Sequence, residues 1–230
     1  MLCKALHNKG ERIFITAKLP DYIRVGKEDL IEKYLFFTTS HDGSGSITAA
    51  FTPIRIVCAN TLNAALRTQT NTVRIRHTAS AKQRLEQAHR VMGITDTLSS
   101  QMQNIFNYWA TVPIKDKAVK KLITLALAPS KEIYSNLKNN TTQELSSCFT
   151  NMIDNAFDYA MNDETQQLPT TKGTVFGAYN AVAGYFQNVR AYKNQEAKVK
   201  SLLLAGNAQQ RNQTAFTLCS EFATNKLQLS

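Results

Sequence analysis

Residues 41–46 hold the residue types of a catalytic triad in one short stretch: His41, Asp42, Ser44 and Ser46. A Ser-His-Asp relay would activate a serine for acyl transfer. Triads are assembled from segments that are distant in the sequence, and neighbours in a tight turn rarely reach the relay geometry. Because Asp42-Gly43 favours the positive φ of a tight hairpin, we interpret the stretch as a turn between two strands.

The remaining histidines and cysteines predict no metal site and no cofactor. His77 and His89 have no carboxylate cluster nearby, and the chain contains neither a Cys-x-x-Cys pair nor a glycine-rich phosphate loop. Among the four cysteines, three sit between apolar neighbours and are expected to be small core residues: Cys58, Cys148 and Cys219.

One pair of carboxylates has helical spacing. Asp154 and Asp158 lie one turn apart, so they could hold a cation on one helix face or form a solvated face, which is the favoured interpretation. No set of residues requires an enzyme, and we expect a protein without catalytic activity.

Positive charge is concentrated in one part of the chain. The 230 residues carry a formal net charge of +10. Between residues 43 and 95 there are seven basic residues and one acidic residue, Glu86, which gives a net charge of +6. The seven are the predicted nucleic-acid-binding residues: Arg55, Arg67, Arg74, Arg76, Lys82, Arg84 and Arg90.

Such a cluster has two interpretations. Lys and Arg on one surface neutralise phosphates and release counterions, which predicts a polyanion partner. The alternative is a solvated surface that keeps the protein soluble. Six of the seven residues are Arg, whose planar guanidinium suits bidentate phosphate contacts, so the first interpretation is favoured. Aromatic residues for stacking on bases occur in the neighbouring strands, at Tyr34, Phe36, Phe37 and Phe51.

The elements that carry these residues change type near residue 78. Alternating and β-branched stretches predict strands at 12–18, 22–25, 31–39, 46–51 and 71–78. Apolar residues at helical intervals after Pro53 predict a helix over Thr52–Arg67 that covers the hairpin. Residues 1–78 are therefore a β-rich sheet with a covering helix.

Residues 79–230 are predicted to be mainly helical. One helix starts at Thr78 or Ser80 and ends at Gly93, and a second follows directly to Trp109. Others lie between Pro113 and Pro129, over 143–159 and from Val175. The polar stretch 162–172 is the best candidate for a loop or hinge. The two regions form either one compact unit or two closely packed lobes.

No apolar run approaches the roughly 20 residues that a membrane-spanning helix needs. The N-terminus lacks the apolar core of a secretory signal, so we expect a cytoplasmic protein without membrane contact.

Several motifs resemble a known family in order and spacing. Ser40-His-Asp-Gly43, Pro53-Ile-Arg-Ile-Val-Cys58, Asn60-Thr-Leu62 and Ile75-Arg-His-Thr78 are similar to the first block of the phage- and plasmid-borne family called domain of unknown function 932. A later segment with Asn180-Ala-Val182 resembles its second block. Members usually carry a further stretch before the position of Arg12, so the resemblance implies a shortened member.

The resemblance implies a mobile genetic element and no established activity. Together with the charge, it predicts an α+β protein of a phage, prophage or plasmid that binds nucleic acid, with single-stranded DNA favoured. Three antiparallel strands, a helix across them and a basic groove are also similar to the core of phage single-strand annealing proteins, which suggests recombination or strand annealing. The alternative is a protein-binding inhibitor or assembly factor that acts on a host defence complex. A second copy of the chain is a further partner to be tested.

Overall fold

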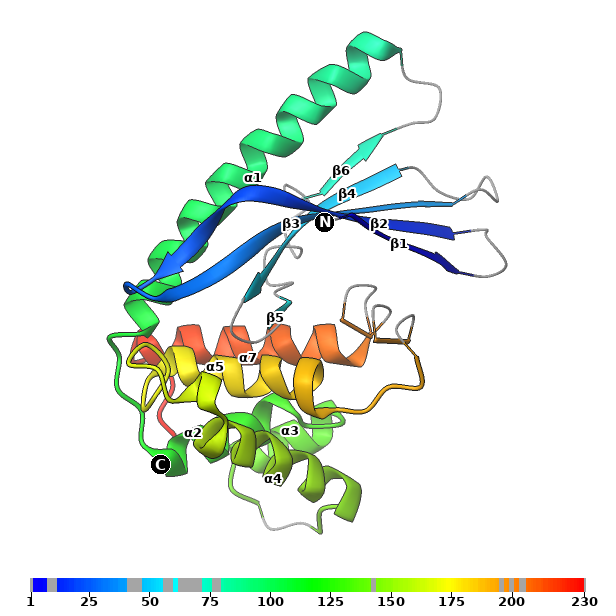
Figure 1. Cartoon of the computed structure of the whole chain (residues 1–230). Helices are drawn as coiled ribbons and strands as arrows, with labels where there is room; N and C mark the ends of the chain where they lie inside the picture. Colours follow the sequence, from blue (N-terminus) through cyan, green and yellow to red (C-terminus); the bar gives the residue numbers. More distant parts are fainter. Residues whose placement is uncertain are drawn as a thin grey trace.

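A computed structural model describes residues 2–7, 12–40, 47–55, 60–61, 72–75, 80–141, 144–194, 197–198, 201–202 and 206–229. In the strands before residue 17 and after residue 35, and at several positions between residues 81 and 94, only the backbone is described. An antiparallel sheet lies over a layer of helices, and one long helix runs along the sheet and continues into that layer (Figure 1). The predicted α+β class is confirmed.

The sheet has six described strands in the order β1-β2-β3-β4, and β4 then pairs with both β5 and β6. Pairing is antiparallel throughout. The predicted strands 12–18 and 22–25 form one strand, β2, with an irregular register between Lys18 and Tyr22. The strands are β1 (Leu2–His7), β2 (Arg12–Val25), β3 (Asp29–Ser40), β4 (Ile47–Arg55), β5 (Asn60–Thr61) and β6 (Thr72–Ile75).

One face of β2 and β3 is buried. Ile23 and Val25 on β2 pair with Ile31 and Asp29 on β3, and all four side chains are at most 4% exposed. Side chains alternate along a strand, so Leu35 belongs to the same buried face. This face packs against the long helix and gives the sheet its part of the core.

The predicted helix over Thr52–Arg67 is wrong in the described residues. Thr52–Arg55 belong to β4, and Asn60–Thr61 form β5 beside it. The apolar residues of this stretch recur at helical intervals. However, β4 pairs with β3 as far as Arg55, and this pairing stabilises a strand there instead of a helix. The helix that covers the sheet is α1 (Ala81–Trp109) instead.

Helix α1 is continuous through Gly93, so the predicted end at that residue is wrong. Ser80 caps the helix: its hydroxyl accepts from the backbone N–H of Gln83, whose side chain accepts from the Ser80 N–H. Gly93 is exposed and does not have the positive φ of a helix-ending glycine. The buried side chains between Leu98 and Trp109, in the second half of α1, pack in a core that includes residues of both the sheet and the helical layer.

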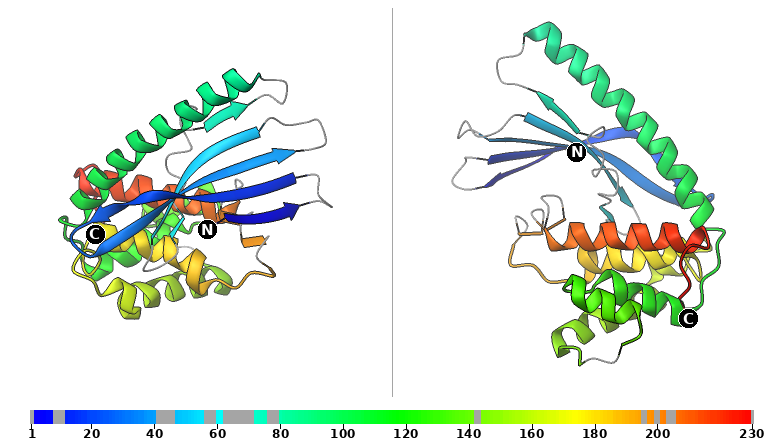
Figure 2. Two further views of the ribbon diagram at one scale, coloured as in Figure 1. Left: turned by 45° about the horizontal axis from the view of Figure 1, so that its top comes forward. Right: turned by 180° about the vertical axis from the view of Figure 1, so that it is seen from behind.

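The right-hand view of Figure 2 shows the helical layer below the sheet, with α1 running from beside the sheet down to the layer. The predicted helix between Pro113 and Pro129 is present, and the predicted helix over 143–159 begins and ends a few residues later in the structure. The elements are α2 (Asp116–Ala126), α3 (Lys131–Lys138), α4 (Ser147–Asn162), the 3-10 helix η4 (Glu164–Gln166), α5 (Val175–Gly184), the π-helical turn η5 (Tyr185–Val189) and α7 (Asn207–Ala223).

Helix α5 is the centre of the helical layer. Every residue from Val175 to Gly184 is buried, as expected for a helix that is apolar on all sides. Rings from three helices meet around it, with Phe106 and Trp109 of α1 within 6 Å of the Tyr179 ring of α5. Phe216 of α7 completes this aromatic cluster.

The predicted loop at 162–172 lies mostly in the segment that joins α4 to α5, which contains η4 and also contacts the sheet. The hydroxyl of Thr170 donates to the carboxylate of Asp29 at the start of β3. The hinge at 162–172 and the division at residue 78 stay predictions. No helix within the described residues is long and apolar enough to cross a membrane.

Candidate functional site

The residues first considered for catalysis lie outside the described part of the chain. These are His41, Asp42, Ser44 and Ser46, together with the predicted Asp42-Gly43 turn. Among the residues that the structure describes, no group of three or more His, Cys, Asp or Glu could hold a metal ion.

The two cysteines whose side chains are described differ. Cys219 is fully buried, as predicted, and burial raises the pKa of its thiol. Cys148 is exposed, so its prediction as a core residue is wrong. It lies in the first turn of α4, where the buried stripe runs through Phe149 and Ile153 and leaves the preceding position outside. Cys58 lies outside the described residues.

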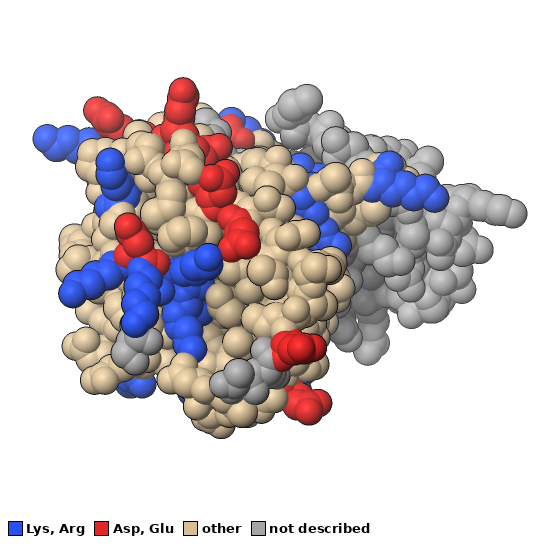
Figure 3. Space-filling model, turned by 90° about the horizontal axis from the view of Figure 1, so that it is seen from below, with Lys and Arg blue, Asp and Glu red and all other residues tan. Residues whose placement is uncertain are grey.

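Asp154 and Asp158 form the solvated face that the sequence favoured. Both are exposed. Asp154 forms an ion pair with Lys120, with 3.0 Å between Oδ1 and Nζ. Asp158 Oδ1 accepts a hydrogen bond from Asn162 Nδ2 at 2.6 Å. The surrounding face of the helical layer carries Lys and Arg beside Asp and Glu (Figure 3), so it is mixed in charge and does not resemble a polyanion-binding surface.

The seven predicted nucleic-acid-binding residues are described to different degrees. Arg67 and Arg76 lie outside the described residues. For Arg55 and Arg74 on the sheet, and Lys82 and Arg84 on α1, the backbone is described and the side chain is not. Arg90 is described in full and is exposed.

The structure brings the elements that carry this charge together. Strand β6 pairs with β4, and α1 packs on both strands. Residues 47–55, 72–75 and the first half of α1 therefore form one edge of the molecule, above and away from the helical layer in Figure 1. We call these three segments the basic edge.

The register and helix bounds show where the backbone of these residues lies. Position 55 is the last residue of β4 and pairs with Ile31, and position 74 on β6 pairs with position 48 on β4. Lys82 and Arg84 lie in the first turn of α1, and Arg90 follows about two turns later. The predicted residues within the described part of the chain are therefore distributed over the three segments of the basic edge.

A polar cluster occupies the outer face of β2 and β3. Glu32 lies between the ammonium group of Lys18 and the hydroxyl of Tyr34, which donates to Glu32 Oε2 at 2.5 Å. Partial burial and the bond to Glu32 raise the pKa of Tyr34 to about 12. Of the four aromatic residues predicted to stack on bases, Tyr34 lies in this cluster, and the side chains of Phe36, Phe37 and Phe51 are outside the described part of the structure.

The two sequence blocks that carry the family resemblance meet in space. Strand β5, which holds Asn60 and Thr61, packs against α5, which holds Asn180. Asn180 is 1% exposed and donates to the backbone oxygen of Phe176. About 120 residues separate the blocks, so the juxtaposition is a property of the fold alone.

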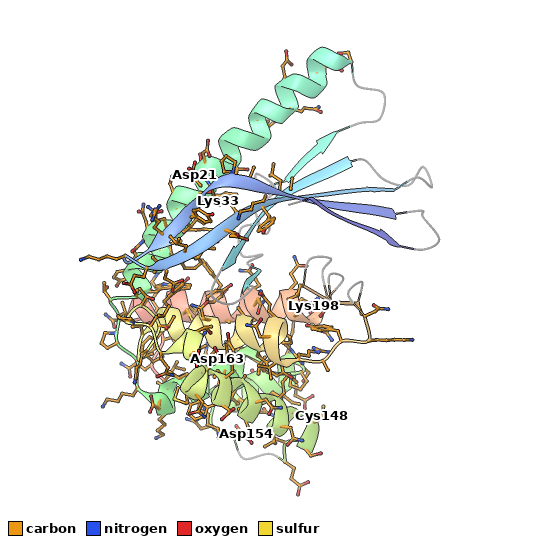
Figure 4. The ribbon with its side chains drawn as sticks, viewed as in Figure 1. Asp21, Lys33, Cys148, Asp154, Asp163 and Lys198 are labelled. Atoms are coloured by element: carbon orange, nitrogen blue, oxygen red, sulfur yellow. The ribbon has the colours of Figure 1, made fainter. Side chains whose placement is uncertain are left out.

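Sequence reasoning missed a pair of arginines at one end of the helical layer. Arg190 follows η5 and Arg211 lies near the start of α7, and both guanidinium groups lie over the ring of Phe186. Cys148 and Lys198 lie toward the same end (Figure 4). The pair carries no local sequence signal, because its members are 21 residues apart on different elements.

No match was found among curated proteins or among solved structures. The family model described as Domain of unknown function (DUF932) matches residues 1–204 of the 230. This match includes the sheet, α1 and the helical layer as far as the segment before α7. The chain therefore belongs to the DUF932 family.

Proposed function

We propose that the protein binds single-stranded nucleic acid, with DNA as the favoured ligand, through the basic edge. The observation that carries the proposal is the assembly of β4, β6 and the first half of α1 into one structural edge. The sequence from residue 43 to residue 95 carries a net charge of +6, and these elements account for most of its described residues.

Two further features support a polyanion ligand. The first turn of α1 contains no acidic residue, so the partial positive charge of the helix N-terminus adds to that of the basic residues. Six of the seven basic residues between residues 43 and 95 are Arg, whose planar guanidinium can stack on unpaired bases as well as bind phosphates, which suits a single strand.

The cellular role follows as part of the proposal. A strand-binding protein of a phage, prophage or plasmid would act in the cytoplasm, in recombination or strand annealing. The competing hypothesis is a protein partner, such as a host defence complex, that presents an acidic surface to the same edge.

The test is fluorescence anisotropy of a labelled single strand of about 30 nucleotides over a series of salt concentrations. Replacing Arg74 and Arg76 together by Gln should weaken binding for every sequence. It should also reduce the slope of log affinity against log salt by about 1 to 2, since each phosphate contact contributes roughly 0.7.

The matched control removes the same charge elsewhere. Lys172 and Lys226 are exposed and lie outside the basic edge. Replacing both by Gln should leave the slope within about 0.3 of the wild-type value. Equal effects of the two double variants would contradict a local site. Absence of any affinity at low salt would overturn the proposal and favour the protein partner.

A further inference from the structure

Two cations share one buried ring at the end of the helical layer. The Cζ atoms of Arg190 and Arg211 lie 5.6 and 6.0 Å from the ring centre of Phe186, which is fully buried. Arg190 also lies 5.3 Å from the ring centre of Tyr192. Guanidinium groups stack well on aromatic faces, so the rings fix both groups in place.

The described residues give this pair no carboxylate counter-charge. The ion pairs within the described residues are made by Lys18 and Lys120, not by these arginines. The guanidinium of Arg211 donates a hydrogen bond from Nη1 to the sulfur of Met152. A thioether is a weak acceptor, whereas a guanidinium has five N–H donors. Burial and the charge of Arg190 both lower the pKa of Arg211. Within the described residues, the guanidinium groups therefore keep N–H donors that the oxygens of an anion could accept from.

Arg211 is also one of the residues that line a groove. It has a volume of about 570 Å³ and lies between the end of α2, the start of α3 and α7. Its lining includes Lys131 and Tyr134 but no Asp or Glu. Asn207 and Gln213 contribute amide groups, which both donate and accept hydrogen bonds. An amide-lined groove of this size with one aromatic ring can accommodate a nucleoside.

We propose that Arg190 and Arg211 together bind the phosphate group of a nucleotide, and that its nucleoside lies in the groove beside Arg211. A phosphate monoester offers three oxygens and up to two negative charges, which can accept hydrogen bonds from both guanidinium groups that lie over the Phe186 ring. The site uses α7, η5 and the α2–α3 turn, none of which belongs to the basic edge. It therefore does not depend on the function proposed above.

The test is isothermal titration calorimetry of the full chain at low salt with three probes: AMP, adenosine and inorganic phosphate. AMP should bind, and each of the other two should bind at least about tenfold more weakly, because each lacks part of the contacts that AMP makes. AMP that binds no better than phosphate would overturn the nucleoside part of the site. Absence of AMP binding would overturn the site itself.

A second comparison identifies the source of the phosphate. A short DNA strand with a 5′-phosphate should bind more tightly than the same strand without it. If it also binds more tightly than AMP, the ligand is the end of a strand, and if AMP is tighter, the ligand is a free nucleotide. A 5′-phosphate that makes no difference contradicts phosphate recognition by Arg190 and Arg211.

Variants separate binding from folding. Arg190→Gln and Arg211→Met should each reduce AMP affinity by roughly tenfold, whereas Lys172→Gln should not change it. Without ligand, Arg211→Met should keep or raise the melting temperature, because it removes a half-buried charge next to another of the same sign. A fall of several degrees would show that Arg211 is structural and would overturn the proposal.

The two proposals fail independently. The Arg74 and Arg76 double variant should bind AMP as the wild type does, and Arg190→Gln should keep the salt slope of unphosphorylated single strands. Loss of AMP binding in the first variant would contradict a separate site.

Discussion

The hydroxyl of Thr170 donates a hydrogen bond to the carboxylate of Asp29 at 3.0 Å, across 141 residues of sequence. Asp29 is 1% exposed and begins β3, and Thr170 lies in the loop before α5. In the same region, Thr170 Cγ2 lies 2.8 Å from the place where a Cβ on Gly26 would stand, and Gly26 has a φ of +61°. A hydrogen bond thus joins the tip of the β2–β3 hairpin to the loop before α5. Beside this bond, a side chain at position 26 would collide with Thr170.

Thr170→Val should destabilise the protein by about 1–2 kcal/mol, since it removes a donor from a buried carboxylate while keeping the shape of the side chain. Urea denaturation measures the change. Thr170→Ser keeps the hydroxyl and should lose less than half as much. Equal losses in the two variants would assign the effect to packing and contradict a role for the hydrogen bond.

Gly177→Ala should be strongly destabilising, by about 2 kcal/mol or more, because the new Cβ would stand 1.9 Å from the backbone oxygen of Thr171. Gly93→Ala is the matched control in a helix. No atom lies within 4 Å of its Cβ position, so it should stabilise by up to about 1 kcal/mol. Thermal melting of the two variants should show shifts of opposite sign. A neutral Gly177→Ala would mean that α5 and the loop before it can move apart.

Arg90→Gln and Glu86→Gln should change strand binding in opposite directions. Both residues are exposed on α1 and lie one turn apart. Loss of Arg90 should weaken binding and reduce the salt slope by about 0.7, whereas loss of Glu86 should strengthen binding by removing a repulsive charge. Anisotropy at two salt concentrations is sufficient. Weaker binding by both variants would point to a folding defect and not to electrostatics.

Tyr34 should titrate well above the ordinary range of a tyrosine. Its pKa is raised to about 12 by burial and by the bond to Glu32. Because the folded chain holds this proton more tightly than the unfolded chain, the stability it contributes is complete below about pH 10 and is lost as the pH rises toward 12. The absorbance difference between wild type and Tyr34→Phe at 295 nm reports this titration.

Two neighbours of Tyr34 provide controls for the same measurement. Glu32→Gln should lower the Tyr34 pKa, because it removes a negative charge that opposes the phenolate. Lys18→Gln should raise it, because the ammonium group favours the phenolate. Shifts of the same sign in both variants would contradict the arrangement of these three residues.

Local periodicity and composition were sufficient to predict several elements of this fold. Alternation predicted β2 and β3, and the apolar spacing between Pro113 and Pro129 predicted α2. The sequence also identified the family, because the motifs are contiguous in the chain. These signals are local, since a period of 2 or 3.6 is set by the backbone of each element alone.

Strand pairing, and the face that each residue occupies, depend on tertiary contacts that the sequence patterns do not contain. Pairing with β3 made Thr52–Arg55 a strand against its helical spacing, and pairing with β2 defined β1, which was not predicted. Helix α1 continues past Gly93 to Trp109 and packs in the core with the sheet and α5, although the sequence predicted that it ends at this glycine. The approach of Arg190 to Arg211, and of β5 to α5, depends on contacts between distant segments, whose energies no local pattern encodes.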